Sequence, residues 1–317
     1  MTSEKTTNDS SAPIRVWNLV GILGISGTIV SVLSGWFWIA DLCSQLNVQY
    51  LGLVILALLL WIHRRMKKTL LLAAGGIAFN LYMIAPYFLQ QSTDESNRPD
   101  FQLAIFNVLR TNENVEQTRT EVMASDPDFL FLMETGPNWD ETLKALSDTY
   151  PHQKRLCRED YTGVAFLSKH PWQSLVVVDV PDANPPLDVS FDINGSAFRM
   201  ILTHPLPPIS PSLRKARDNQ LLHLAGEISS EFPTLFAGDF NLAPWSYHFG
   251  QLLKAGELRD LSLGFGVAPT LTPLPTWFGG VKVDHILGNK SVSVEDFQLG
   301  SSEFSDHRPV IIEFSIE

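Results

Sequence analysis

The stretch Thr-Leu-Phe-Ala-Gly-Asp-Phe-Asn, residues 234–241, is an apolar run that ends in polar side chains. Short apolar runs of this kind are typical of buried strands. Where such a strand ends it meets solvent, and catalytic groups usually gather in the loops at that edge of a sheet. Asp239 and Asn241 are therefore candidate functional residues. A lone acid in this place is more often a cap or a turn residue, so this stretch by itself does not indicate a function.

The same arrangement recurs through residues 101–317. The run Phe-Leu-Phe-Leu-Met, 129–133, leads directly into Glu134. Together the polar residues at the ends of the expected strands form a set of Asp, Glu, Asn and His, and these types recurring at strand ends predict one shared site. The residues are Asn107, Glu134, His204, Asp239, Asn241, Asp284, Asp306 and His307.

Residues 101–317 alternate short apolar runs with fewer segments of helical periodicity. Asn194-Gly195 lies between two alternating runs, which is a strong hairpin signal. About 215 residues with this pattern predict a single α+β domain with much antiparallel pairing. The expected strands are 101–108, 128–133, 163–168, 174–180, 187–193, 197–203, 234–237, 283–287, 291–297 and 310–316, and the expected helices are 113–124, 138–146, 211–230 and 246–255.

Four short motifs occur in a fixed order along this region: Phe106-Asn107-Val108, Leu132-Met133-Glu134, Gly238-Asp239-Phe240-Asn241 and Ser305-Asp306-His307-Arg308-Pro309. In this order they resemble the motifs of the endonuclease/exonuclease/phosphatase superfamily, which includes pancreatic deoxyribonuclease, apurinic endonucleases, neutral sphingomyelinases and inositol-polyphosphate phosphatases. The resemblance covers about 101–316. It implies a four-layer α/β/β/α sandwich of two mixed, mostly antiparallel sheets. It also implies metal-dependent hydrolysis of a phosphoester.

The resemblance further implies a ligand set for a divalent cation. Asn107 and Glu134 match the metal ligands of the family, and Asp306 matches a third acidic contact. Carboxylate and amide oxygens suit Mg²⁺ or Mn²⁺, which are hard cations. The expected cofactor is therefore Mg²⁺ or Mn²⁺.

The other motif residues correspond to catalytic roles in the family. His307 matches the general base, and Asp284 matches the acid that holds its imidazole. Asp239 and Asn241 match the pair that orients the water and a phosphoryl oxygen. His204 matches a second histidine that donates a hydrogen bond to phosphate or protonates the leaving oxygen.

Several positions depart from the family pattern or have an ordinary alternative. Leu109 stands where some nucleases of the family have an acid, and Asn112 is a candidate to take part in its place. His285 is expected to be a structural or rim residue. We expect Arg217 on a solvated helix face, with contact to a phosphate as the alternative. Residues 264–280 form either a substrate-facing loop or an ordinary connection.

The first ninety residues have a different composition. Residues 16–40, 46–62 and 69–89 are apolar stretches without a charged side chain. Because about 20 apolar residues are needed to cross a bilayer, they predict an anchor of three transmembrane helices in residues 1–90, followed by a linker at 91–100. The alternatives are the buried helices of a soluble core and a cleaved signal peptide.

Basic residues predict the orientation of this anchor. Lys5 and Arg15 precede the first stretch, and His-Arg-Arg-Met-Lys-Lys, 63–68, separates the second from the third. Cytoplasmic loops are enriched in Lys and Arg. A multi-pass protein of the cell (inner) membrane is therefore expected, with a cytoplasmic amino terminus and an extracytoplasmic catalytic domain.

The net charge of residues 91–317 limits the classes of substrate and partner that are expected. Residues 91–317 carry 17 of the 23 basic and 31 of the 34 acidic side chains, a net charge of about −14. This disfavours tight non-specific binding of nucleic acid, which depends on Lys and Arg contacts to phosphates. The expected substrate is a phospholipid head group, a small phosphoester or a nucleic acid, and the expected partner is the lipid bilayer. The sequence points to no obligate protein partner.

Two functions from other classes are weaker. A binding protein on a degenerate catalytic fold would have lost catalytic residues, which are present here. A transporter would be expected to show a pair of charges inside the membrane, and the apolar stretches contain none. No phosphate-binding loop of the Gly-x-x-x-x-Gly-Lys type and no Gly-x-Ser-x-Gly motif is found in the sequence.

Overall fold

The computed structural model describes residues 12–63, 67–89, 99–180, 184–229, 231–272 and 279–317. The chain divides into two compact units, Met1–Ala85 and Pro86–Glu317. The expected linker at 91–100 lies mostly outside the described residues, as do Lys5 and residues 64–66 of the basic segment.

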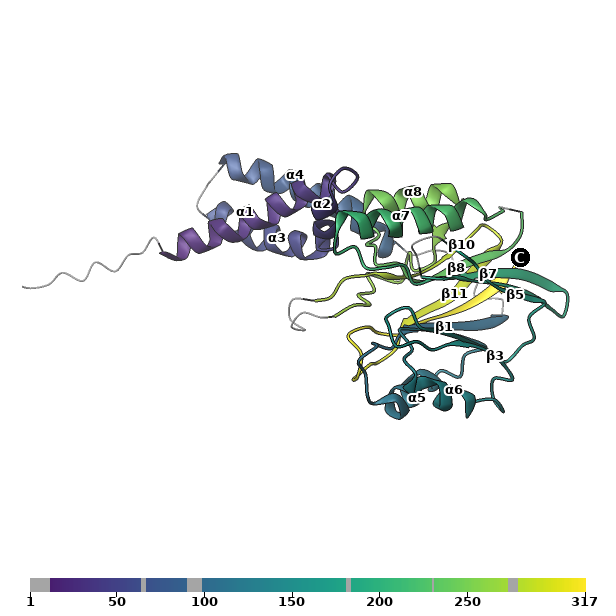
Figure 1. Ribbon diagram of the computed structural model, residues 1–317. Helices are drawn as coiled ribbons and strands as arrows, with labels where there is room; N and C mark the ends of the chain where they lie inside the picture. The colour runs from purple at the N-terminus through teal and green to yellow at the C-terminus, as the bar shows by residue number, and fades with distance from the viewer. Residues whose placement is uncertain (1–11, 64–66, 90–98, 181–183, 230, 273–278) are drawn as a thin grey trace, which may run out of the picture. The chain divides into compact units, whose positions relative to one another are not determined.

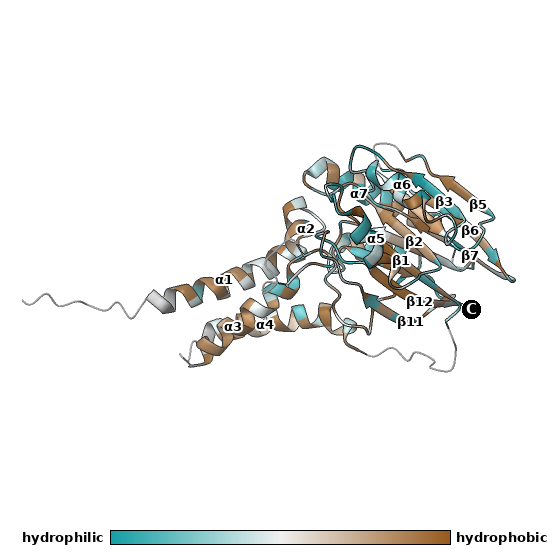
Figure 2. Cartoon of the chain, turned by 90° about the horizontal axis from the view of Figure 1, so that it is seen from below, coloured by the Kyte–Doolittle hydropathy of each residue, from teal (hydrophilic) through white to brown (hydrophobic). Residues whose placement is uncertain are grey.

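The first unit is helical. Its helices are α1 (Ala12–Val32), α2 (Trp38–Ser44), α3 (Asn47–His63) and α4 (Lys67–Ile84), and a short 3-10 turn η1 (Ala85–Tyr87) follows α4. Val54, Ala57, Trp61 and Ala73 pack together between these helices. Many other apolar side chains face outward, such as Leu71 with 78% of its surface exposed. Figure 2 shows α1, α3 and α4 mostly in hydrophobic shades.

The helices do not match the expectation of three transmembrane spans. Among the described residues one helix, Thr69–Tyr87, is long and apolar enough to cross a membrane. The segment expected at 16–40 ends its helix at Val32, because Ser34 and Gly35 interrupt it and both are poor helix formers. The helices Trp38–Ser44 and Asn47–Ile62 are long and apolar enough to cross a membrane only if they are taken together, and the pair is bent by 68°. The part of the chain described here thus holds one candidate span, or two if the bent pair is one.

The second unit contains two mixed β-sheets of six strands each. In spatial order the first consists of β11 (Val292–Leu299), β12 (Val310–Ile316), β1 (Phe101–Asn107), β2 (Phe129–Met133), β4 (Val164–Ser168) and β3 (His152–Leu156). The second consists of β5 (Ser174–Val177), β6 (Leu187–Ile193), β7 (Ser196–Leu202), β8 (Thr234–Asp239), β10 (Asp284–Gly288) and β9 (Arg259–Asp260).

The two sheets pack face to face, with helices on the outside. Phe129, Phe166, Phe191 and Phe198 are among the side chains that fill the space between the sheets. Helices α5 (Val115–Met123) and α6 (Asn138–Lys144) cover the first sheet, and α7 (Pro211–Gly226) and α8 (Tyr247–Ala255) cover the second (Figure 1). The predicted four-layer sandwich is confirmed.

Strand register gathers the polar strand ends. Strands β1 and β2 are parallel, with Asn107 opposite Met133, so Asn107 and Glu134 leave the first sheet at one edge. Strands β7 and β8 are also parallel, while β10 runs antiparallel to β8 with Asp284 opposite Asp239. All remaining strand pairs among the described residues are antiparallel. The predicted site residues of each sheet therefore lie together at one end of its strands.

Two strands were not expected from the sequence. Strand β3 is the polar segment His-Gln-Lys-Arg-Leu, half-buried at the edge of the first sheet, so it shows no apolar run. Strand β9 is only two residues long. It carries the buried Asp260.

Candidate active site

Backbone conformation turns the chain sharply at the strand ends. Glu134, Asn241 and Leu109 have φ angles of 60°, 50° and 63°, in the left-handed region that residues with a side chain rarely adopt. Such conformations cost free energy and cluster at functional sites. Here they occur directly after β2, β8 and β1, where the chain leaves the two sheets.

A glycine allows the two sheet-forming segments at Asp239 to approach each other. Gly238 has a φ of 146°, and a Cβ at this position would lie 1.7 Å from the carbonyl oxygen of Thr203. Only glycine fits so close to the neighbouring backbone. Gly238 therefore brings Asp239 beside Thr203 and His204 at the end of β7.

Asp239 is the centre of the site. Its carboxylate is buried, and Oδ2 accepts a hydrogen bond of 3.1 Å from Nδ2 of Asn107. The same oxygen lies 3.6 Å from Nε2 of His204 and 3.7 Å from Nε2 of His307. Its other oxygen, Oδ1, accepts a 2.8 Å hydrogen bond from the backbone of Asn241. One carboxylate thus connects residues from both sheets.

Glu134 lies on the first-sheet side of this cluster. Its Oε1 accepts a 2.9 Å hydrogen bond from Nδ2 of Asn107 and lies 3.9 Å from Nε2 of His204. Its Oε2 accepts a 3.0 Å hydrogen bond from the backbone of Arg110. The amide of Asn107 therefore bridges the carboxylates of Glu134 and Asp239.

His307 forms the opposite side of the site. Its Nδ1 is 2.8 Å from Oδ2 of the buried Asp284, which makes Nδ1 the donor and leaves Nε2 toward Asp239. Ser305 attaches this loop to β1, because its hydroxyl donates to the carbonyl oxygen of Asn107 at 2.8 Å and accepts from the backbone of His307 at 3.0 Å. The imidazole is held in one orientation.

Electrostatics at the site follow from burying several carboxylates together. Burial and the negative charge of Asp284 raise the pKa of Asp239 to about 6, against the opposing effect of His307 and His204. Burial lowers the pKa of His307, but Asp284 and Asp239 outweigh it and raise that pKa to about 10. Burial also works against ionised Asp284, yet His307 and Thr270 hold its pKa below the usual value.

The structure brings together seven of the eight residues singled out in the sequence. The eighth, Asp306, directly precedes His307 in the chain. Within the described residues no hydrogen bond joins its carboxylate to Glu134 or Asn107, and its Oδ1 is buried without a hydrogen-bond partner. The roles of these residues remain predictions.

The donor set fits a divalent cation. Ligand atoms of Asp239, Asp284 and His307 lie within 4.8 Å of one another. Oδ1 of Asp284, like Oδ1 of Asp306, is a buried acceptor without a partner. Buried unpaired acceptors are costly, and an oxygen-rich set of this kind suits Mg²⁺ or Mn²⁺. The tightest group includes Asp239, which the sequence pattern assigned to catalysis rather than to the metal.

Arg217 corrects an expectation. We expected a solvated helix face, but the side chain is fully buried; its Nη1 donates to the carbonyl oxygen of Asn241 at 2.7 Å and its Nε to Asp218 at 3.0 Å. It therefore supports the left-handed Asn241. The signal was present in the sequence, because Arg217 lies four residues after Leu213 and four before Leu221, on the apolar stripe of α7.

The other positions left open in the sequence have structural surroundings. Asn112 is buried and joins the loop after β1 to α5, because its side chain donates to Val108 and to Thr118 of α5 and accepts from Asn114. His285 is buried, with Nε2 2.7 Å from the carbonyl oxygen of Leu242. In the loop at 264–280, residues 273–278 lie outside the described residues.

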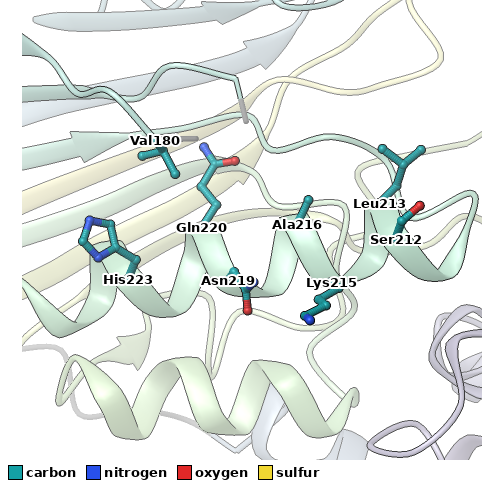
Figure 3. A pocket seen from close by; sticks show the side chains of 8 residues that line it. All are labelled: Val180, Ser212, Leu213, Lys215, Ala216, Asn219, Gln220 and His223. Carbon is teal, nitrogen blue, oxygen red and sulfur yellow. The ribbon is translucent and has the colours of Figure 1, made fainter. Parts of the chain in front are cut away.

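A hollow of about 640 Å³ runs along α7 away from these residues (Figure 3). It is lined by Val180 and by residues of α7 that include Lys215, Gln220 and His223. None of the eight predicted site residues lines it.

Comparison with known proteins agrees with the fold and the motifs. Residues 78–307 match the Endonuclease/Exonuclease/phosphatase family. The chain belongs to this family, whose members include phosphoester hydrolases, and it is an enzyme of that class. No curated protein matches the chain closely enough to add to this.

Solved structures show the same fold. An endonuclease/exonuclease/phosphatase from Beutenbergia cavernae is 18% identical, with a TM-score of 0.56, and the match covers 69% of this chain and 72% of that one. A humanized D. rerio TDP2 is 17% identical, with a TM-score of 0.57 and coverage of 68% and 98%. Sphingomyelinase C from Streptomyces griseocarneus is 18% identical, with a TM-score of 0.51 and coverage of 68% and 99%.

Proposed function

We propose that this protein is a membrane-tethered phosphoesterase that depends on a divalent metal and hydrolyses its substrate with an activated water. The observation that carries this proposal is the position of His307. Its Nδ1 is bonded to Asp284 while Nε2 lies 3.7 Å from Asp239, in the cluster that also contains Asn107 and Glu134. This is the arrangement of a base held by an acid beside a set of metal-binding groups.

The chain's own residues divide the work. Asp284 fixes the tautomer and orientation of His307 and stabilises the imidazolium that forms when Nε2 takes a proton from water. Asp239 and Asn241 orient that water and a phosphoryl oxygen. His204 is buried beside Asp239 and Glu134, so it is placed to donate a hydrogen bond to phosphate or a proton to the leaving oxygen.

Glu134, Asn107 and Asp306 would hold the cation, with Asp239 next to them. When bound, Mg²⁺ or Mn²⁺ supplies positive charge that neutralises phosphoryl oxygens and the carboxylates that keep a proton on His307. Burial lowers the pKa of His307 but Asp284 and Asp239 outweigh it, so a cation beside these carboxylates would favour the unprotonated imidazole that a base requires. Activity is therefore expected to require the metal.

The tether in this proposal is α4. Arg64, Arg65, Lys67 and Lys68 lie at the amino-terminal end of this helix, and the acidic residues Asp94 and Glu95 lie beyond its other end. The positive-inside bias therefore favours a cytoplasmic amino-terminal end. The enzymatic unit then lies outside the cytoplasm at the cell membrane. A reporter enzyme fused after residue 95 tests this arrangement: activity only on the extracytoplasmic side is expected, and a cytoplasmic signal would contradict it.

The acidic character of the enzymatic unit favours a phospholipid head group or a small phosphoester over nucleic acid. A tethered site near the bilayer also encounters lipid phosphates at high local concentration. The test is a panel of phospholipids, phosphoinositides, plasmid DNA and RNA given to the detergent-solubilised full chain, with and without EDTA. His307→Ala serves as the blank. Lipid phosphoester hydrolysis above the blank is expected; cleavage confined to nucleic acid would reject this substrate class.

A further inference from the structure

A second group of ionisable side chains lies inside the fold, outside the site described above. Asp260, Lys282 and His285 are each 1% exposed or less. Nζ of Lys282 lies 3.8 Å from Oδ2 of Asp260, and Nδ1 of His285 lies 3.9 Å from the same oxygen. Burying such charges has a high desolvation cost, and replacing them with apolar residues is often neutral for stability. A purely structural purpose therefore explains the group poorly.

One side of this group contacts the end of the apolar helix. Tyr87, the last residue of Thr69–Tyr87, is buried within the second unit, and its hydroxyl donates a 2.9 Å hydrogen bond to Oδ2 of Asp260. Its ring meets that of Trp245 edge to face at 5.6 Å. Its carbonyl oxygen accepts a 2.5 Å hydrogen bond from the backbone of Gly266. Tyr87 is thus part of the interior of the second unit, which carries the candidate active site.

The other side of the group contacts Asp284. Nζ of Lys282 donates to the carbonyl oxygen of Asp284 at 3.3 Å, and the backbone N–H of Asp284 donates to the hydroxyl of Thr270 at 3.1 Å. The backbone N–H and the carbonyl oxygen of Asp284 are therefore both fixed by hydrogen bonds. The carboxylate of this residue is the partner of Nδ1 of His307.

We propose that Tyr87 is a positioning residue for the Asp284–His307 pair, acting through Asp260 and Lys282. The inference rests on the proposed function, because it assigns His307 the role of base. Tyr87 fixes the Asp260 carboxylate, Asp260 fixes the Lys282 ammonium, and Lys282 fixes the carbonyl of Asp284. Hydrolysis then depends on a residue at the end of the helix that precedes the sandwich, which a chain starting at residue 101 would lack.

Tyr87→Phe in the detergent-solubilised full chain tests this inference, with Tyr150→Phe as the matched control. Tyr150 is equally buried and donates a 2.8 Å hydrogen bond to the carbonyl oxygen of Pro127, away from the site. Both variants lose one buried hydrogen bond, so both are expected to lower the melting temperature to a similar degree. Only Tyr87→Phe is expected to lower kcat, by about tenfold with KM unchanged. Equal kcat values for the two variants would overturn the inference.

A second readout separates this inference from the proposed function. The Nδ1–H proton of His307 in its bond to Asp284 gives a downfield NMR resonance that needs no substrate. Tyr87→Phe is expected to shift this resonance and Tyr150→Phe to leave it in place; an unshifted resonance in Tyr87→Phe overturns the inference. A wild-type chain that hydrolyses no phosphoester would reject the proposed function, while the NMR comparison would still test Tyr87.

A double variant covers the case in which Tyr87→Phe does not fold. Asp260→Asn with Lys282→Met removes both charges together, so neither partner is left as a lone buried ion. The same shift of the His307 resonance and the same selective loss of kcat are expected. Wild-type values for both in a folded double variant would overturn the inference.

Discussion

Two clusters of buried ionisable groups meet at neighbouring residues of β10, and they behave in opposite ways. Burial raises the pKa of Asp239, and Asp284 adds to this, so that it reaches about 6. Burial acts on Asp260 in the same direction, but Lys282, His285 and Ser262 outweigh it and hold the pKa of Asp260 below its usual value. The carboxylate of Asp260 is paired with the ammonium of Lys282 inside the fold. In the other cluster, the carboxylates around Asp239 outnumber the histidines that could carry a balancing positive charge.

The difference shows how a site that binds a cation can be told from a cluster whose charges are already paired within the fold. Burial alone does not distinguish them, because both clusters are buried. The distinguishing property is an excess of negative charge with unpaired acceptors, such as Oδ1 of Asp284 and Oδ1 of Asp306. Such an excess is a free-energy cost that a cation can offset, so it indicates a binding site.

The largest effect is expected from removing the base. His307→Ala should lower kcat by about 10²–10⁴-fold, the usual contribution of general base catalysis. His223→Ala is the control, since His223 is exposed on α7 and lines the hollow away from the site. Steady-state kinetics on the best phosphoester of the panel measures both. Comparable rates for the two variants would remove His307 from the mechanism.

Matched substitutions of the two aspartates sharpen the comparison. Asp260→Asn leaves the buried Lys282 without its counterion and should cost about 3–5 kcal/mol, or a fall of roughly 10 °C in Tm. Asp239→Asn removes a carboxylate whose ionised form is disfavoured in the fold. It should therefore raise Tm at pH 8 in EDTA, while kcat falls by about 10²-fold or more. Calorimetry that shows Tm shifts of the same sign would contradict the distinction.

The pH dependence of stability reports on His307. Its pKa is raised from 6.5 to about 10 in the folded chain, so its contribution to stability is complete below pH 6.5 and is lost as the pH rises through 10. In EDTA, wild-type stability should fall between pH 7 and pH 10 by at least about 1 kcal/mol more than that of His307→Asn. Thermal melts at the two pH values measure this, and parallel curves for the two proteins would refute it.

The smallest effect is expected at Asn112. Asn112→Ala should lower stability by about 1–2 kcal/mol, because the loop after β1 loses its internal hydrogen bonds. The value of kcat should remain within about twofold of wild type, since the hydrogen bonds of this side chain go to Val108, Thr118 and Asn114, none of which is a predicted site residue. A large loss of kcat at unchanged stability would instead support the catalytic part that the sequence pattern left open.

The apolar runs predict an α+β domain and most of its strands because this information is local, whereas the four-layer sandwich follows from the resemblance of the motifs to a known superfamily. Apolar runs gave most strands, and the polar residues at their ends gave the site, as with Glu134 after 129–133. The polar edge strand β3 could not be found this way, since it is half-buried and has no apolar run.

Contacts between segments far apart in the chain could not be predicted from the sequence pattern. No local signal in the sequence links Tyr87 to Asp260, which lies 173 residues away. The number of transmembrane spans was overestimated because a hydropathy pattern reports only how apolar a stretch is. It does not show the helix break at Ser34-Gly35 or the bend between α2 and α3. Arg217 is buried although it is charged, because it lies on the apolar stripe of α7 and its guanidinium finds hydrogen-bond partners inside the fold.

The most direct test of the account is hydrolysis of bis(p-nitrophenyl) phosphate by the detergent-solubilised full chain, followed through removal and return of the metal. The account predicts release of p-nitrophenol in Mg²⁺ or Mn²⁺. In EDTA the rate should fall to that of His307→Ala, and added metal should restore it. A rate that EDTA leaves unchanged, or one that His307→Ala shares, would contradict the assignment of this cluster as a metal-dependent hydrolytic centre.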